Sequence, residues 1–314
     1  MARDEVSSAA EDWAARRRAI LAGRHWSSPN GLRPRWRHRL FSMSLKLFGL
    51  GLRLTPLQGR GLRNALDLEL VELEMPLAGL PAAFDGYRIL HVSDTHLDVL
   101  PAVADAAARL LDGLEVDLLV LTGDVHGFPH HALKLSVEPL ARALNGVRVR
   151  ERRLAVLGNH DPVEMVQALQ PLGFETLVNR STTLTRGGET VHVTGLDDVH
   201  SFYSPAARIA LERPQDGFRI ALVHSAEMAD HAAAADYALY LCGHTHGGQI
   251  CLPDGRPIFS QLVRCRHGAA GVWRQEKMVG YTSAGLGVSP PTVRFNCRGG
   301  AALITLRRQQ ASGH

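Results

Sequence analysis

The chain has 314 residues, of which 45% are hydrophobic and 21% are charged, and its net charge at pH 7 is +4. This length and composition are typical of a globular protein with one large α/β domain or two ordinary ones. The four cysteines have no C-x-x-C spacing, which argues against a disulfide framework or a zinc knuckle and favours reduced thiols in the cytoplasm.

The positive charge is concentrated at the N-terminus. Residues 1–64 contain thirteen Lys and Arg against four Asp and Glu, a net of +9, whereas the rest of the chain carries −5. This asymmetry excludes a uniformly basic nucleic-acid-binding domain, and we expect no nucleic acid among the partners. We therefore divide the chain into a basic N-terminal arm, residues 1–64, and a domain of residues 65–314.

The arm contains one strongly amphipathic segment, residues 40–54. On a helix, large apolar side chains cover most of its circumference. The remaining narrow stripe holds Ser42, Lys46, Gly49 and Arg53. Pro56 ends the pattern, and about fifteen residues are fewer than the roughly 20 that span a bilayer. The segment is therefore predicted to be an amphipathic helix that does not cross a membrane.

Two interpretations of this helix remain open. Either it packs on the protein's own body or on a partner, or it lies in a membrane interface. In the second case each basic residue near anionic lipid contributes about 1 kcal/mol. Trp26 and Trp36 suit both interpretations. Because no cleavage pattern of a secretory signal follows, we expect a cytoplasmic protein held peripherally at the inner membrane face.

From about Leu68 the chain alternates short apolar runs with helical stretches. The first half has a βαβα pattern, and the second half is rich in strands. Strands are predicted within residues 68–76, 87–94, 117–124, 152–161, 189–198, 218–225, 237–246, 277–287 and 301–308, and helices within 102–114 and 229–238.

Five of these strands run directly into polar residues, in the sequences SDTH, TGDV, LGNHD, LVHS and CGHTH. Ligands of open α/β sheets bind at the carboxyl ends of the strands, so we expect these side chains to converge. Asp, Asn and His together suit Mn²⁺, Fe or Zn²⁺ better than a magnesium cage made only of oxygen. There are more donors than one ion requires, which indicates two metals that share a carboxylate. Glycines 123, 158 and 243 are expected at positive φ or at close backbone approaches.

In their order, these motifs resemble those of the calcineurin-like metallophosphoesterases, which are D-x-H, G-D, G-N-H-[DE], H and G-H-x-H. The matching residues are 94–96, 123–124, 158–161, 224 and 243–246, and the resemblance spans about residues 87–306. It implies an α/β fold, a sandwich of two mixed β-sheets flanked by helices. In this chain the N-terminal amphipathic helical arm precedes that sandwich.

The resemblance also implies a role for each matching residue. The ligands of a first divalent metal are Asp94, His96 and His246. The ligands of a second are Asn159, His224 and His244, and Asp124 bridges the two. The implied chemistry is attack by a metal-activated hydroxide on a phosphoryl group. His160 stabilises the transition state and protonates the leaving group, and Asp161 is expected to orient its imidazole.

Finer features favour one branch of the family. The sequences GHTHGGQICLP, YTSAGLGVS and VRFN resemble membrane-associated bacterial phosphodiesterases and relatives that act on UDP-2,3-diacylglucosamine. We therefore expect a phosphoesterase that acts on a phosphodiester or a pyrophosphate. One alternative is a UDP-2,3-diacylglucosamine pyrophosphohydrolase of lipid A synthesis, whose substrate is a lipid nucleotide. The other alternative is a non-catalytic interaction scaffold with the same fold.

The loop after Asp124 contains three further histidines, His126, His130 and His131. They contact substrate or form a histidine-rich surface loop, and the second interpretation is favoured. The sequence does not indicate the oligomeric state.

Overall fold

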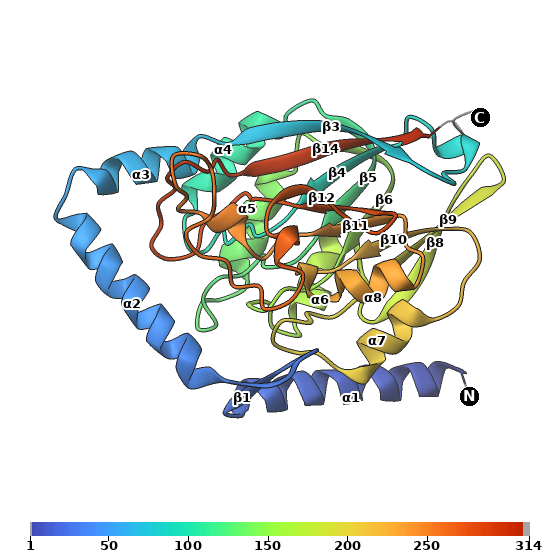
Figure 1. The fold of residues 1–314 in the computed structure, drawn as a ribbon, viewed down its shortest axis with the longest axis horizontal. Helices are drawn as coiled ribbons and strands as arrows, with labels where there is room; N and C mark the ends of the chain where they lie inside the picture. The colour runs from blue at the N-terminus through green and yellow to red at the C-terminus, as the bar shows by residue number, and fades with distance from the viewer. Residues whose placement is uncertain (1, 310–314) are drawn as a thin grey trace.

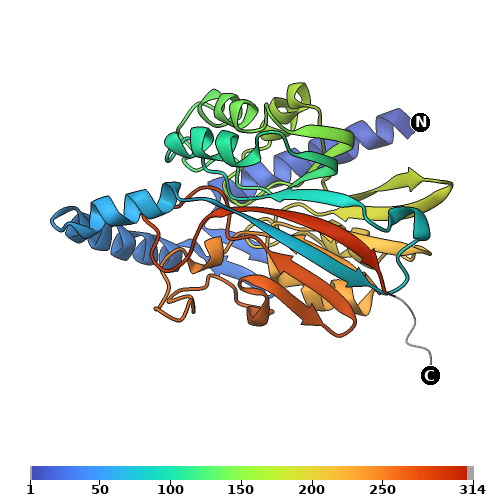
Figure 2. The ribbon, with the colours of Figure 1, turned by 90° about the horizontal axis from the view of Figure 1, so that it is seen from above.

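The structure, a computed structural model, describes the backbone of residues 2–309 and the side chains of residues 12–309 except 37, 38 and 41. Two six-stranded sheets pack face to face, and helices cover their outer faces (Figures 1 and 2). Both sheets mix parallel and antiparallel pairs. The predicted sandwich of two mixed sheets flanked by helices is confirmed.

The first sheet is mainly parallel. In spatial order its strands are β3 (Glu69–Leu77), β14 (Gly300–Arg308), β4 (Arg88–Val92), β5 (Glu115–Leu121), β6 (Arg148–Ala155) and β7 (Phe174–Thr176). The strands β4 to β7 run parallel to one another, and β14 is antiparallel to β4. The polar loops that follow β4, β5 and β6 therefore leave the same edge of this sheet.

The second sheet has a parallel centre and antiparallel edges. Its order is β12 (Gly271–Gln275), β13 (Met278–Thr282), β11 (Leu239–Cys242), β10 (Phe218–Leu222), β9 (Glu189–Gly195) and β8 (Arg180–Arg186). The strands β9, β10, β11 and β13 are parallel, so the loops after β10 and β11 also share one edge.

The core has three layers. On β5, Leu118 and Val120 point to the core between the sheets, where they join Ile220 of β10. Alternate residues of a strand point to opposite faces, so Leu119 of the same strand packs on the outer helices instead. The helices on the first sheet are α4 (Ala102–Leu111), α5 (Lys134–Ala143) and α6 (Met165–Leu169). Those on the second are α7 (Pro205–Glu212) and α8 (Ala229–Ala234). The 3-10 helices are Ala82–Phe84, Gln170–Leu172, Ala226–Met228, His246–Gly248 and Arg266–Gly268.

The N-terminal arm wraps around one end of the sandwich (Figure 1). Its elements are α1 (Ala2–Ala22), β1 (His25–Ser28), β2 (Gly31–Pro34), α2 (Arg35–Arg53) and α3 (Leu57–Leu66). The hairpin of β1 and β2 joins α1 to α2. Helix α2 begins five residues before the predicted segment 40–54, directly after Pro34, whose fixed φ suits a helix start.

Helix α2 turns its more apolar face away from the domain. The side that faces the domain holds Ser42, Leu45, Gly49 and Leu52, and the ideal Cβ position of Gly49 lies 3.1 Å from Cβ of Pro291. The opposite side carries an apolar stripe with helical spacing, whose members are 52–85% exposed: Trp36, Leu40, Met43, Leu47, Leu50 and Leu54. Helix α2 therefore contacts the protein's own body through its weakly hydrophobic side, as one of the two interpretations expected, and leaves the apolar stripe exposed.

Among residues 2–309, we find no helix with the length and hydrophobicity needed to cross a membrane.

Candidate metal centre

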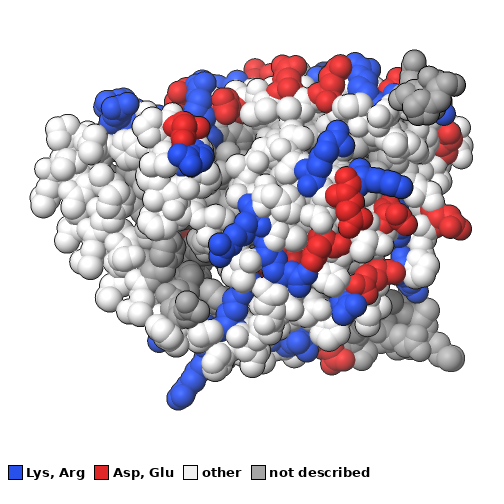
Figure 3. Space-filling view, viewed as in Figure 1, with Lys and Arg blue, Asp and Glu red and all other residues white. Residues whose placement is uncertain are grey.

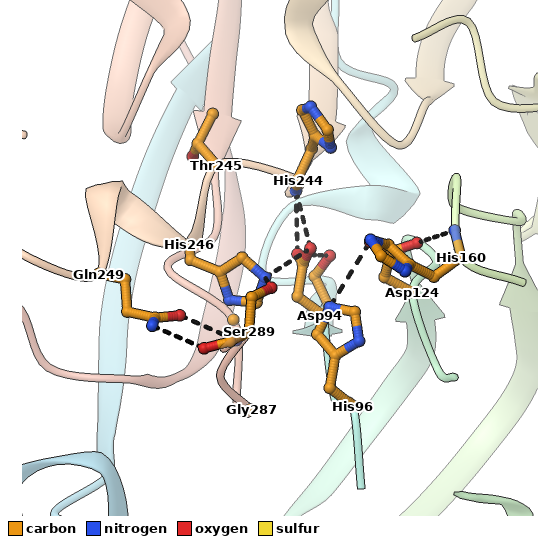
Figure 4. A network of polar contacts seen from close by, with 12 residues as sticks. Asp94, His96, Asp124, His160, His244, Thr245, His246, Gln249, Gly287 and Ser289 are labelled. Atoms are coloured by element: carbon orange, nitrogen blue, oxygen red, sulfur yellow. Dashed lines mark hydrogen bonds and ion pairs between the residues drawn. The ribbon is translucent and has the colours of Figure 1, made fainter. Parts of the chain in front are cut away.

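Two groups of buried side chains meet at the carboxyl ends of the central strands. Within each group, one potential ligand atom per residue lies within 4.8 Å of the others. The first group is Asp94, His96 and His246, and the second is Asp124, His224 and His244. Figure 4 shows members of both groups close together. The six residues of the two groups come from loops after four different strands, β4, β5, β10 and β11. These are six of the seven residues predicted to bind metal.

Asp124, a member of the second group, also lies close to the first. Its Oδ2 atom is 3.5 Å from Nε2 of His96 in the first group and 3.3 Å from Nε2 of His224 in the second. Asn159, the seventh predicted ligand, places Oδ1 3.2 Å from Nε2 of His224. The structure thus brings all seven residues together, with a carboxylate where the prediction requires a bridge.

Several buried nitrogen atoms here have no hydrogen-bond partner. They include Nε2 of His96, Nε2 of His244 and Nδ1 of His246. A buried polar atom without a partner is costly, and a cation bound beside Asp124 would satisfy Nε2 of His96, which lies 3.5 Å from Oδ2 of that carboxylate. His244 and His246 face their groups with the other ring nitrogen: Nδ1 of His244 is 3.2 Å from Nε2 of His224, and Nε2 of His246 is 3.7 Å from Oδ1 of Asp94. Imidazole and carboxylate donors without thiolate suit Mn, Fe or Zn ions. The residues present therefore fit divalent metals.

The backbone at these positions is strained. Five predicted ligands adopt positive φ values, which non-glycine residues rarely do: Asp94 (49°), His96 (39°), Asp124 (53°), His244 (74°) and His246 (52°). They are five of the eleven non-glycine residues with positive φ in the described part of the chain. Such strain costs of order 1–3 kcal/mol per residue and is found where function requires a particular side-chain position.

Two of the predicted glycines permit close approaches beside the ligands. An ideal Cβ on Gly158 would lie 2.1 Å from Oδ1 of Asp124, and one on Gly243 would lie 2.1 Å from Oδ2 of Asp94. Any larger residue at either position would displace a carboxylate of the site.

Burial and mutual charge set the protonation of the site. Burial raises the pKa of Asp94 to about 6, and burial lowers the pKa of His96 to about 4. Burial also acts to lower the pKa of His224, but the carboxylates of Asp124 and Asp94 outweigh it and raise that pKa to about 10. Because a histidine must be deprotonated to bind metal, a cation at this position competes with the proton that these carboxylates attract.

His160 lies beside the first group. Its ring centre is 5.3 Å from that of His96, and its backbone N–H donates to Oδ1 of Asp124 at 2.9 Å. Its Nδ1 atom is 3.0 Å from the carbonyl oxygen of Gly127. Since a carbonyl only accepts hydrogen bonds, Nδ1 carries a proton in this contact, and Nε2 is the ring nitrogen that can transfer a proton to substrate.

The prediction that Asp161 orients the imidazole of His160 is wrong. The Asp161 carboxylate turns away from that ring and accepts backbone N–H groups of both ligand loops. Its Oδ2 accepts from Asp124 at 2.8 Å and from Gly158 at 2.9 Å, and its Oδ1 accepts from His126 at 3.0 Å. The Asp161 carboxylate therefore links the loops that follow β5 and β6 by hydrogen bonds. The Gly127 carbonyl, not Asp161, orients His160.

The three further histidines have different environments. His126 is buried, and its Nδ1 lies 2.8 Å from Oγ of Ser136. His131 contacts Asp98, with 3.0 Å between Nδ1 and Oδ2, whereas His130 is exposed. The favoured interpretation as a surface loop is thus wrong for His126, because its ring is buried and its Nδ1 lies between the hydroxyl of Ser136 and the carboxylate of Asp98, which is 3.8 Å away.

One neighbouring loop was missed at the sequence level. His200 lies in the loop after β9, and its ring centre is 4.1 Å from that of His244. Its Nδ1 is 3.4 Å from Oε2 of the fully buried Glu227. Strand β9 runs into Asp197 and Asp198, the same pattern of an apolar strand followed by polar residues that identified the other five loops. This pattern was sufficient to predict that the loop after β9 lies beside the metal centre.

The fold and the donor groups together define a metal-dependent phosphoester hydrolase. The family model of the calcineurin-like phosphoesterases matches residues 87–248, and the chain belongs to this family.

Two relatives in sequence agree with this assignment. The chain is 30% identical over 253 residues to the uncharacterized metallophosphoesterase YkuE of Bacillus subtilis, with 76% of this chain and 86% of the relative covered. It is 26% identical to phosphodiesterase YaeI of Escherichia coli, over 70% of this chain and 82% of that protein. Among solved structures, phosphopantetheinyl hydrolase of Mycobacterium tuberculosis is 12% identical, with a TM-score of 0.41 and coverage of 67% of this chain and 92% of that one.

Proposed function

We propose that the protein hydrolyses a phosphodiester or pyrophosphate bond with two divalent metal ions, Mn, Fe or Zn, held by the seven predicted ligands. The observation that carries this proposal is the position of the Asp124 carboxylate, within 3.5 Å of a nitrogen in each of two buried donor groups. Similarity to a relative named as a phosphodiesterase supports a diester as the substrate.

The chain's own residues divide the chemical work. When bound, divalent ions withdraw charge from a phosphoryl oxygen and lower the pKa of water, so no side-chain nucleophile is needed. Asp124 and the histidines hold the ions, and the buried setting strengthens these contacts. The Gly127 carbonyl fixes Nδ1–H of His160, which directs Nε2 as the proton donor to the leaving oxygen.

We further propose that α2 holds the enzyme at an anionic membrane surface, on its inner face. The apolar stripe is unpartnered among the described side chains, and the surface around it carries few charges (Figure 3). Basic residues of the arm, such as Lys46 and Arg53, flank the stripe and would meet lipid phosphates. The four cysteines are free thiols, which agrees with a reducing compartment.

The enzymatic proposal is tested by titrating metal-free protein with Mn²⁺. The panel is an aryl phosphodiester, an aryl phosphomonoester, cyclic nucleotides and UDP-2,3-diacylglucosamine. We expect metal-dependent cleavage of a diester or pyrophosphate, and its loss in Asp124→Ala. Preference for the lipid nucleotide would identify the pyrophosphohydrolase alternative. No turnover of any panel member by protein with two bound metals would refute the enzymatic proposal and leave the scaffold alternative.

The membrane proposal is tested by sedimentation with vesicles of phosphatidylglycerol or of phosphatidylcholine. We expect binding to the anionic vesicles, and binding more than tenfold weaker in the double variant Leu47→Glu and Leu50→Glu. The matched control is Ile209→Glu on α7, which changes an equally exposed apolar residue away from α2. Equal binding by the control and the double variant would refute the role of α2. An absence of wild-type binding would leave a protein partner for the stripe.

A further inference from the structure

An arginine from the first helix of the arm reaches the metal centre. Arg17 on α1 is 1% exposed, although it lies 141 residues before its nearest partner in sequence. Its Nη2 atom donates to the carbonyl oxygens of Gly158 at 2.6 Å and Asp161 at 2.7 Å. These two carbonyls flank Asn159 and His160, the predicted metal ligand and proton donor.

Two further contacts hold the Arg17 guanidinium. Its Nη1 atom donates to Oδ1 of Asp197, and its guanidinium carbon lies 4.0 Å from the centre of the Phe202 ring. Trp13, one turn earlier on α1, donates from Nε1 to the other oxygen of Asp197 at 2.6 Å. The buried guanidinium is thus paired with a carboxylate, which a buried charge requires.

The arm also pairs with the loop that contains His200. Ser27 of β1 donates from its backbone N to the carbonyl of Ser201 at 2.9 Å and accepts from the backbone N of Tyr203 at 3.0 Å. Arg33 of β2 donates to both carboxylate oxygens of Glu227, at 2.8 and 2.9 Å. These contacts surround the loop whose His200 ring touches that of His244.

The family match begins at residue 87, so these contacts are made by residues that lie outside the matched region. A planar guanidinium binds two acceptors in fixed directions, which a lysine cannot reproduce. Holding both ends of the turn 158–161 fixes where Asn159 and His160 stand relative to the other ligands. Misplacement of such groups by about 1 Å can cost 10²-fold in rate.

We propose that Arg17 is a positioning residue for this turn, and that the arm is an integral part of the catalytic centre. The inference rests on the proposed function for its kinetic consequence only, because the geometry of the turn can be measured without turnover.

The test compares full-length Arg17→Met with the matched control Arg18→Met. Arg18 is the next residue on the same helix, and among the described side chains it pairs with the exposed Glu164 at 2.7 Å. In metal-free protein, we expect amide hydrogen exchange at residues 158–161 to be at least tenfold faster in Arg17→Met and unchanged in Arg18→Met. With Mn²⁺ and the preferred panel substrate, we expect kcat to fall about tenfold with KM within threefold, because the turn acts after substrate is bound.

Arg17→Lys keeps the charge opposite Asp197 but loses the planar guanidinium that binds several acceptors at once. We therefore expect intermediate values of kcat and of amide hydrogen exchange at residues 158–161. It also replaces Arg17→Met if that variant does not fold. Unchanged exchange at 158–161 would overturn the inference, and so would faster exchange with a kcat within twofold of wild type. A similar decrease in kcat in Arg18→Met would show a general effect of disturbing α1 and would overturn the specific role of Arg17. If wild-type protein has no turnover, the proposed function fails, and the exchange measurement alone still decides whether Arg17 holds the turn.

Discussion

The tie made by Asp161 gives the sharpest test of how the two ligand loops are joined. Its carboxylate accepts three backbone N–H groups, from Asp124, His126 and Gly158, and it is 2% exposed. A hydrogen bond to a charged group contributes about 1.5–3 kcal/mol, and a deleted partner leaves buried donors unsatisfied. Partial relaxation and entry of water reduce the total, so we expect Asp161→Ala to lower the free energy of unfolding by about 4 kcal/mol.

The conservative variant Asp161→Asn separates this role from the alternative one. Its amide keeps one oxygen for Asp124 and Gly158, but its NH₂ group faces the N–H of His126. We expect a loss of about 2 kcal/mol and at least tenfold weaker Mn²⁺ binding.

Urea unfolding and metal titration measure both quantities. Asp254→Asn is the control, because Asp254 is half exposed and pairs only with nearby Arg256 in the described structure. We expect that control to change stability by less than about 0.5 kcal/mol. If Asp161→Asn keeps wild-type stability and metal affinity but loses turnover, the carboxylate acts on His160 after all, and our interpretation of the loop tie is refuted.

Three further predictions concern neighbouring residues. His160→Gln should retain both metals while kcat falls about 10²–10⁴-fold, as metal analysis and steady-state rates will show; loss of metal would contradict its role as proton donor. Gly243→Ala should lower stability by about 2 kcal/mol in thermal unfolding and weaken metal binding, because its Cβ would lie 2.0 Å from Oγ of Ser93. Burial acts to raise the pKa of Glu227, but His200 and Arg33 outweigh it and lower that pKa below its ordinary 4.5. Its carboxylate therefore stabilises the fold above pH 4.5 and loses this effect as the pH falls through the lowered value. Glu227→Gln should cost about 1–2 kcal/mol at pH 7 and progressively less as the pH falls below 4.5 in urea unfolding, and a cost independent of pH would contradict the ion pair.

The central strands and the gathering of donors were predictable from sequence for a physical reason. Buried parallel strands have continuous apolar sequences, and each polar residue at their ends is visible against that background. The edge strand β8 was missed because Leu184 is the single large apolar residue in its sequence RSTTLTR and gives no alternating pattern. The orientation of Asp161 was also out of reach, because adjacency to His160 along the chain does not determine which N–H groups its carboxylate meets.

The contacts of the N-terminal arm could not be predicted from its sequence. Its charge suggested contact with lipid, yet Arg17 is buried against two carbonyls and a carboxylate of the domain. Trp26 likewise lies near His200, with 6.4 Å between ring centres, whereas Trp36 stands in the apolar stripe. Nothing in the local pattern of a basic helix separates an arginine that pairs with backbone carbonyls from one that faces solvent. The amphipathic segment was recognisable, but the direction of its apolar face depends on the shape of the domain beside it.

Helix α2 is fixed at both ends. Before it, the hairpin is joined to the domain through Ser27 and Arg33; after it, Asn64 of α3 donates to the carbonyl of Arg294 at 2.9 Å. A helix mounted in this way is already ordered before it meets any surface, so binding incurs little loss of conformational entropy. In the proposed membrane-bound state, the same contacts would set the angle between the domain and the membrane. A flexible tether would let the catalytic centre face any direction, whereas a helix fixed at both ends would give the enzyme a single orientation toward the proposed membrane surface.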